Sequence, residues 1–439
     1  MIYFYSDKLT PRVQYIAAHI FTTMLKQQVK WVNAIEQLPD PATHVVVAYT
    51  AQSCPKGVFK VTPYGLLFKK GLKKQEFQVG KWQGLTTFFQ TLDGNIPFDI
   101  FSAVFYLITR YEEYVADEAD FDEMGRFKAT ASLAYQQGFL MEPLVDKWVM
   151  AFEKELAACS PLYKPSANRA FVFRPLVVID KLFKYRNNPI LHNFYTLFGN
   201  IRKGKWHAVL TQLKVRLRIE EDPYNNVASL LLLHNRNNLL PVFFLRVSYD
   251  SYKEKPLYTR TVSYKNLISS HYLFELHSSP QAAQSFDKLA SERKKLYKIT
   301  RSQVNMNCFH KLAFRMPSSY RNLLKLSFKD DFSMVYPDML GFRASTCTPY
   351  KYYDLEKEDY YKLQIHPIAF CDDMLRGGQY TQQDVYEKLM ALAAQVAEVY
   401  GEFSCIFHND VLSDTGRYRH WLAVYESSLR TIAKMEVKY

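Results

Sequence analysis

Two apolar runs in the second part of the chain restrict the possible folds more than any other feature. They cover residues 171–179 and 240–247, and both are suited to strands that are buried on both faces. Such strands are typical of parallel sheets, in which a helix usually connects one strand to the next. Segments with helical patterns lie between and after the two runs. The pattern predicts an α/β barrel or a layered α/β sheet.

The first part of the chain also combines short strands with helices. Three segments have strand character: residues 2–5, 44–49 and 58–61. Helices are expected after Pro11 over residues 13–25, in the stretch PFDIFSAVFYLITRYEEY over 97–114, and over about 143–158. An acidic stretch follows residue 112, and charge runs of this kind usually form solvated loops. This part of the chain is therefore expected to be α/β or α+β.

A proline-containing stretch marks the best domain boundary. The chain has 439 residues, which is more than one compact core usually holds, so two domains are expected. Two prolines and several small polar residues separate the helix near residue 158 from the strand near residue 171. We therefore predict a smaller N-terminal α/β domain over residues 1–160, a linker over 161–169 and a C-terminal deformed (β/α) barrel over 170–439.

Several classes of protein are disfavoured by the sequence. The chain has no secretory signal and no apolar stretch long enough for a membrane span, so a cytoplasmic protein is expected. Its six cysteines form no CxxC pair, which argues against a disulfide framework or a zinc ribbon. No nucleic-acid-binding module, P-loop or GxGxxG motif is present, and no nucleic-acid partner is expected.

The charge and the aromatic content leave alternatives open. Between Lys181 and Arg218 there are nine Lys and Arg residues and no Asp or Glu, within a chain of net charge +13. This segment could bind an anionic glycan, a phosphate or a nucleic acid, or it could be a solvated helix face. Aromatic residues make up 15% of the chain, which suits either buried cores or surfaces that stack on sugars or bases.

Candidate chemical residues lie near the ends of apolar runs in the second part of the chain. The carboxyl ends of barrel strands meet on one face, so residues that end such runs can be brought together there. Asp180 ends one run and is placed to be a metal ligand, a base or a helix cap. The other candidates are His277, His310, Asp331, Arg343, His366, Asp372 and His408.

The order of these residues resembles that of the polysaccharide deacetylase (NodB-homology) family, in particular a branch with an extra N-terminal α/β domain. The resemblance covers nearly the whole chain. In the first part it rests on the stretch 97–114, on Gly125-Arg126-Phe127 and on residues 143–148. In the second part it rests on the segments 175–186, 277–279, 310–320, 331–334, 341–344, 365–367 and 407–409.

The resemblance implies a metal-dependent hydrolysis of N-acetyl groups on a sugar or polysaccharide. A divalent metal, with zinc as the first expectation, would polarise the acetyl carbonyl and its water, while an Asp acts as base and a His as acid. By this resemblance Asp180, His277 and His310 hold the metal. Arg343 orients the base, Asp372 supports the catalytic histidine, and His408 is that histidine. The substrate is expected to contact His366, Asp331 and Asn409.

One carboxylate of the family's pattern is missing. An alignment without gaps puts Val178 at the position of the base, and the alternative register makes Asp180 the base and leaves Leu182 at the metal position. Two hypotheses therefore stand side by side. In the first, the chain is a metal-dependent carbohydrate deacetylase. In the second, it is a catalytically degenerate relative that binds a glycan or another partner through an aromatic cleft and the basic segment 181–218.

Overall fold

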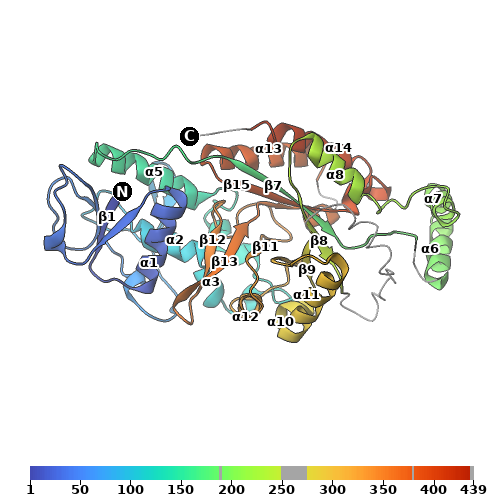
Figure 1. The fold of residues 1–439 in the computed structure, drawn as a ribbon, viewed down its shortest axis with the longest axis horizontal. Coiled ribbons are helices and arrows are strands. Elements are labelled where there is room, and N and C mark those ends of the chain that lie inside the picture. Colours follow the sequence, from blue (N-terminus) through green and yellow to red (C-terminus); the bar gives the residue numbers. More distant parts are fainter. Residues whose placement is uncertain (187–189, 249–273, 378–379, 436–439) are drawn as a thin grey trace.

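Two separate β-sheets organise the chain, one in each part. The computed structural model describes all residues except 187–189, 249–273, 378–379 and 436–439. The first sheet has four parallel strands in the order β2-β1-β3-β4 and the second has nine strands. Figure 1 shows the N-terminal sheet at one end of an elongated molecule, the large sheet in the middle and helices α6 and α7 at the other end.

The N-terminal sheet contains the three strands that were expected and one more. Its strands are β1 (Ile2–Ser6), β2 (Val29–Val32), β3 (Val45–Tyr49) and β4 (Phe59–Val61). A short hairpin of β5 (Gly80–Trp82) and β6 (Leu85–Thr87) follows. The alternation of Ile2 and Phe4 with Tyr3 sends apolar side chains to one face of β1, where they join the core.

The helices of the first part lie close to their expected positions. Thr10 caps α1 (Pro11–Ala17), and the chain continues as a π-helix, η1 (Ala18–Met24). The stretch over 97–114 forms two helices instead of one, because Arg110 adopts a left-handed backbone conformation between them. The remaining helices are α2 (Ile100–Ile108), α3 (Tyr111–Tyr114), α4 (Leu133–Gln136) and α5 (Leu144–Cys159).

The second sheet has the order β12-β13-β11-β10-β9-β8-β7-β15-β14. All of its neighbouring strands are parallel except β12 and β13, which are antiparallel. The strands are β7 (Val172–Ile179), β8 (Val242–Arg246), β9 (Phe274–Ser278), β10 (Met306–Phe309), β11 (Asp330–Met334), β12 (Tyr350–Asp354), β13 (Asp359–Pro367), β14 (Phe370–Cys371) and β15 (Glu402–His408). The two apolar runs are β7 and β8, which pair in parallel as expected.

Helices connect and cover these strands. They are α6 (Ile190–Arg202), α7 (Trp206–Arg216), α8 (Val227–Arg236), α10 (Pro280–Gln284), α11 (Phe286–Thr300), α12 (Ser318–Lys325), α13 (Gln382–Glu398) and α14 (Trp421–Ile432). Apolar side chains of α8, α11, α13 and α14 belong to the same core cluster as the outward-facing residues Val177 and Ile179 of β7. The strand-then-helix pattern of the sequence therefore corresponds to real crossover units.

The large sheet curls into a partial barrel. His366 on β13 and Glu402 on β15 are hydrogen-bonded at 2.7 Å, although these strands are far apart in the strand order. Phe244 of β8 and Phe332 of β11 pack with their ring centroids 5.5 Å apart across the interior. A separate apolar cluster that includes Leu176, Val178 and Ile406 fills this interior. The expected fold class, an α/β barrel-like sheet preceded by a smaller α/β region, is confirmed.

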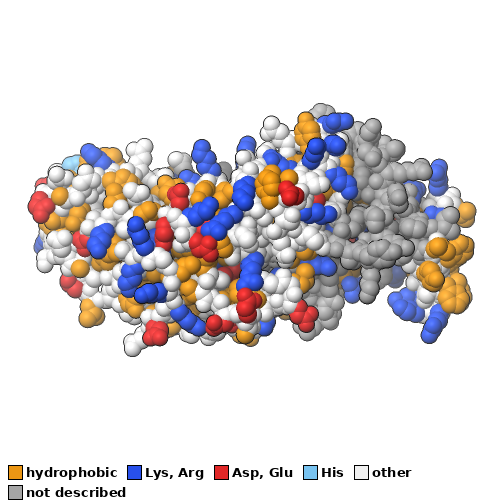
Figure 2. All heavy atoms as spheres, turned by 90° about the horizontal axis from the view of Figure 1, so that it is seen from below, with side chains coloured by type: hydrophobic (Ala, Val, Ile, Leu, Met, Phe, Trp, Pro, Cys, Tyr) orange, Lys and Arg blue, Asp and Glu red, His pale blue; other side chains and the backbone are white. Residues whose placement is uncertain are grey.

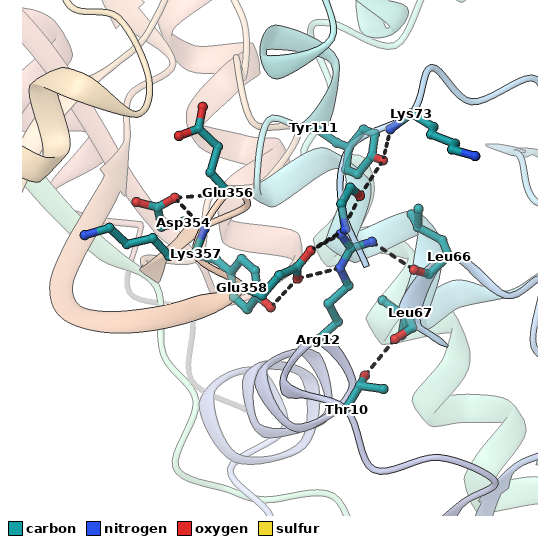
Figure 3. A network of polar contacts seen from close by, with 12 residues as sticks. Thr10, Arg12, Leu66, Leu67, Lys73, Tyr111, Asp354, Glu356, Lys357 and Glu358 are labelled. Carbon is teal, nitrogen blue, oxygen red and sulfur yellow. Dashed lines mark hydrogen bonds and ion pairs between the residues drawn. The ribbon is translucent and has the colours of Figure 1, made fainter. Parts of the chain in front are cut away.

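A buried ion pair attaches the N-terminal region to the β12–β13 hairpin (Figure 3). Arg12 of α1 is buried, and its Nε donates to Glu358 Oε2 at 2.8 Å. Its Nη1 also donates to the carbonyl of Leu66 at 3.0 Å, and Tyr353 OH donates to Glu358 Oε2 at 3.0 Å. Arg12 and Glu358 each have several partners, so this network ties α1 to the β12–β13 hairpin.

One continuous apolar core runs through both parts of the chain, from Ile2 to Ile432. Most of the aromatic residues belong to this core: Phe101, for example, packs against Phe4, Phe21, Tyr49 and Phe152. The division at residues 161–169 stays a prediction. Among the described residues, no helix combines the length and the apolar character needed to cross a membrane.

Candidate metal centre and the cleft around it

The period of the strands places four polar side chains at one end of the barrel. On β7, Leu176 and Val178 face the apolar interior, so Asp180, two residues further, continues the inward series just beyond the strand. On β15 the same period leads from Ile406 to His408. His277 lies on β9, and His310 follows the end of β10. All four stand at the carboxyl ends of parallel strands.

Asp180, His277 and His310 converge on one point. Asp180 Oδ1 lies 3.4 Å from His310 Nδ1 and 3.6 Å from His277 Nε2, and the two ring nitrogens are 3.0 Å apart. All three side chains are buried or nearly so. Four tetrahedral ligand atoms at about 2.0–2.1 Å from a zinc ion are separated by about 3.3 Å. The spacing of these three donors therefore fits a divalent metal.

The hydrogen bonding of the three residues also fits a metal centre. Asp180 Oδ1 is a buried atom to which the described residues offer no well-formed hydrogen bond. Buried polar atoms without partners are rare in folded proteins, and each such atom needs an explanation. One carboxylate and two imidazoles form a common ligand set for zinc, and a bound ion would satisfy Asp180 Oδ1.

The protonation states of Asp180 and His277 suit a metal centre. Burial alone would raise the pKa of Asp180, but the close approach of His310, 3.4 Å from Oδ1, holds it well below its ordinary value. Burial lowers the pKa of His277 well below its ordinary value, more strongly than the charge of Asp180 raises it. A carboxylate that stays ionised and an imidazole that stays neutral are both ready to bind a cation.

His408 is held next to this cluster by Asp372. Its Nδ1 lies 2.5 Å from Asp372 Oδ1, and its backbone N–H donates to Asp372 Oδ2 at 2.7 Å. The rings of His408 and His277 have centroids 6.3 Å apart. Burial alone would lower the pKa of His408, but the charges of Asp372 and Asp373 raise it to about 10. His408 is therefore an imidazolium at neutral pH and can donate a proton.

A cleft of about 480 Å³ opens over these side chains. Asp180, His310 and His408 form part of its lining. The other lining residues are Arg126, Lys181, Tyr224, Arg246, Lys311, Pro337, Asp338, Asp373 and Asp410. Tyr224 is the one Phe, Tyr or Trp among these lining residues, so this cleft is mainly polar and charged in the part of the chain that the structure describes.

Several of these cleft residues were not among the sequence candidates. Arg246 could have been found, because it continues the inward series of Val242 and Phe244 on β8. Arg126 belongs to the Gly125-Arg126-Phe127 motif of the N-terminal region and donates to the carbonyl of Lys311 at 2.9 Å. No signal in the sequence placed this motif at the barrel.

Arg343 lies elsewhere than expected. Its Nε and Nη2 donate to the two carboxylate oxygens of Glu113, at 2.9 and 2.7 Å. The guanidinium thus faces the N-terminal region, and no contact with Asp180 is recorded among the described residues. The acidic stretch after residue 112 is correspondingly not a solvated loop at its start, because Glu113 is buried.

The three residues expected to contact a substrate all form hydrogen bonds within the protein. Asp331 faces away from the barrel interior, because its neighbour Phe332 faces into it, and its carboxylate accepts from Asn307 and Ser333. His366 is bonded to Asp330 and Glu402, the first residues of β11 and β15, at the opposite end of β15 from His408. Asn409 donates to the carbonyls of two residues of the cleft wall, Lys181 and Tyr224.

The fold and the cluster define an α/β protein with a partial barrel and a candidate metal centre at the carboxyl ends of its strands. Comparisons with known proteins agree with this description only in part. Residues 2–161 match the model of a family of unknown function, DUF7033. The comparison with curated proteins found no match.

Two solved structures are similar to part of the chain. One is described as a polysaccharide deacetylase from Mycobacterium smegmatis, with 12% identity and a TM-score of 0.40, over 62% of this chain and 87% of that one. The other is the Puue allantoinase, with 12% identity and a TM-score of 0.40, over 62% of this chain and 94% of that one.

Proposed function

We propose that the chain is a metal-dependent hydrolase of amide bonds, with the N-acetyl group of a sugar or polysaccharide as its substrate. The observation that carries the proposal is the convergence of Asp180, His277 and His310 beside the His408–Asp372 pair in one cleft. The resemblance of the sequence motifs to polysaccharide deacetylases supports the choice of substrate. It also supports the expectation of zinc.

The roles of the residues follow from their chemistry. Asp180, His277 and His310 would hold the ion, which would act as a Lewis acid on the amide carbonyl and lower the pKa of water. Water adds to the carbonyl carbon, the C–N bond breaks, and the leaving amine takes a proton from His408. Asp372 keeps that imidazole protonated and correctly oriented.

The base requires a carboxylate, and Val178 cannot provide one because it belongs to the apolar barrel interior. We assign this role to Asp373. It lines the same cleft as Asp180, and one of its carboxylate oxygens lies within 4.8 Å of a ring nitrogen of His408. From this position it would accept the proton that water loses.

Release of acetate from a chitooligosaccharide by the zinc-loaded protein tests the proposal. We expect Asp180→Ala to abolish release together with zinc binding. His408→Ala should retain zinc but lose about 10²–10⁴-fold in rate, and Asp373→Asn should lose a similar factor. His207→Ala, which changes an exposed histidine, is the control and should have no effect. Wild-type protein that binds zinc but releases no acetate would contradict the proposal.

A second candidate function rests on the packing of Val178. If the carboxylate that the family uses as its base has been lost without replacement, the cleft would bind a glycan without cleaving it. In that case the zinc-loaded wild type would bind the chitooligosaccharide in calorimetry and release no acetate. Asp373→Asn would then leave the affinity unchanged.

A further inference from the structure

Helices α6 and α7 form a hairpin that protrudes from the end of the molecule (Figure 1). It is inserted between β7 and α8, directly after the segment that carries Asp180. Asp222 closes the base of the insertion, because its carboxylate accepts from the backbone N–H groups of Lys184, Tyr185 and Arg186 at 2.7–2.9 Å. The hairpin is therefore a defined structural element with a fixed point of attachment.

The buried side of this hairpin is partly polar, since α7 buries Gln212 together with Val209 and Val215, and many large apolar side chains stay outside. Gln212 of α7 is 2% exposed and points toward α6, where its Nε2 donates to Asn193 O at 2.9 Å and to Thr196 Oγ1 at 3.1 Å. Large apolar side chains lie on the outside, with Phe194 64%, Tyr195 78% and Phe198 68% exposed. Soluble helix pairs normally bury such side chains between them.

The outward apolar side chains follow helical spacing on both helices. On α6 they are Leu191, Phe194, Tyr195, Phe198 and Ile201, and along α7 they are Trp206, Leu210, Leu213 and Leu217. We call this set the hairpin's apolar face. In the part of the chain that the structure describes, every side chain of this face remains exposed to solvent. A face of this size in water requires an apolar partner.

Positive charge surrounds the apolar face. Arg202, Lys203 and Lys205 stand exposed around the turn between the helices, and Arg216 and Arg218 are exposed near the end of α7. Figure 2 shows hydrophobic and basic side chains next to each other at this end of the molecule. There is no acidic residue from Lys181 to Arg218, and Glu220, which follows, pairs with Lys214. The mixture of exposed Trp, Phe and Leu with Lys and Arg is typical of helices that lie in the interface of an anionic bilayer.

We propose that the α6–α7 hairpin docks the protein on the surface of an anionic phospholipid bilayer. The apolar face enters the boundary between headgroups and acyl chains, and the basic residues contact lipid phosphates. With 13 and 11 residues, the helices lie along the surface. A second copy of this chain fits the face poorly, because a symmetric contact would bring the same basic residues together.

The attachment of the hairpin adjoins the cleft. Lys181 and Tyr224, on either side of the hairpin's attachment, both line the cleft that contains Asp180. The side-chain amide of Asn409 donates hydrogen bonds to the backbone carbonyls of both residues. The base of the hairpin is therefore part of the cleft wall.

Co-sedimentation of the full chain with phosphatidylcholine vesicles, with and without phosphatidylglycerol, tests the proposal. We expect binding that requires phosphatidylglycerol and weakens at high salt. Phe194→Ser combined with Phe198→Ser should weaken binding at least about ten-fold, because two large apolar groups leave the bilayer. Lys203→Glu combined with Lys205→Glu should have a similar effect.

Matched controls change exposed residues far from the hairpin. Leu92→Ser, and Lys69→Glu combined with Lys70→Glu, should bind vesicles like the wild type. Binding that does not depend on phosphatidylglycerol, or that is unchanged in both hairpin variants, would overturn the proposal. So would a concentration-dependent dimer that the Phe194→Ser and Phe198→Ser changes abolish, since the face would then belong to a second copy.

Discussion

Glu113 and Arg343, 230 residues apart, form a buried two-bond ion pair between the N-terminal region and the barrel. Arg110 donates to the same Glu113 carboxylate at 2.8 Å and to Tyr336 at 3.1 Å. The N-terminal region thus supplies the counter-ion for an arginine that follows a barrel strand. The N-terminal region is therefore part of what holds the barrel wall in place.

Removal of Glu113 should destabilise the whole chain. Burial alone would raise the pKa of Glu113, but Arg343 and Arg110 lower it, so the carboxylate is ionised at neutral pH. Glu113→Ala leaves the buried Arg343 guanidinium without its carboxylate, while Arg110 keeps its ion pair with Glu112 at 2.8 Å. Removal of one partner of a buried ion pair costs about 3–5 kcal/mol. Urea denaturation measures this loss. The control is Glu118→Ala in the same segment, where an exposed pair with Arg315 is lost and less than about 1 kcal/mol is expected.

Zinc should stabilise the wild-type protein by binding to Asp180, His277 and His310. At a concentration about 100 times the dissociation constant, a ligand of the native state adds about 2.7 kcal/mol to the free energy of unfolding. We expect this gain to disappear on chelation and in His277→Ala and His310→Ala. Thermal unfolding with and without zinc, together with metal analysis, measures it. The proposed metal centre would be refuted by an equal gain in both variants.

The raised pKa of His408 should depend on Asp372. In Asp372→Asn the largest effect that raises this pKa is gone, and burial, which lowers it, remains. We expect the pKa of His408 in the metal-free protein to fall clearly below about 10, although the charges of Asp373 and Asp180 still raise it. Titration of the histidine ring protons by NMR measures the change. A pKa that stays near 10 would mean that Asp372 does not stabilise the protonated ring of His408.

The same pair predicts a pH dependence of stability. The pKa of His408 in the folded protein lies above its value in the unfolded chain, so the stabilising contribution is complete below about pH 6.5 and is lost as the pH rises toward 10. Asp372→Asn should reduce this slope, because only part of the raised pKa remains. Denaturation of metal-free wild type and variant at several pH values between these limits provides the comparison.

The residues of the candidate metal centre were singled out by their places at the ends of apolar runs together with the resemblance to polysaccharide deacetylases. Asp180 continues the inward series of β7, and the candidates on β9, β10 and β15 end at the same level of the barrel. For Asp331 the same argument failed by one residue, since Phe332 takes the inward position. The actual partner of Arg343 could not be predicted, because Glu113 is brought to it only by the docking of the two regions.

His366 was expected to contact the substrate. Its side chain instead lies at the end of the barrel opposite to His408 and joins two strands there. Its ring bonds Glu402 at 2.7 Å and Asp330 at 3.0 Å. Burial alone would lower the pKa of His366, but these two carboxylates raise it. Burial alone would raise the pKa of Glu402, but His366 lowers it to about 2.

His366→Gln should therefore lower stability without affecting the metal. The contribution of the pair is complete between the unfolded pKa values of about 4.5 for Glu and 6.5 for His. It falls toward pH 2 as Glu402 is protonated, and it falls above pH 6.5 as His366 loses its proton. The difference in unfolding free energy between wild type and His366→Gln should be largest in this window, measured by urea denaturation. Loss of zinc from His366→Gln would contradict the prediction, because His366 would then act on the metal centre from the opposite end of the barrel.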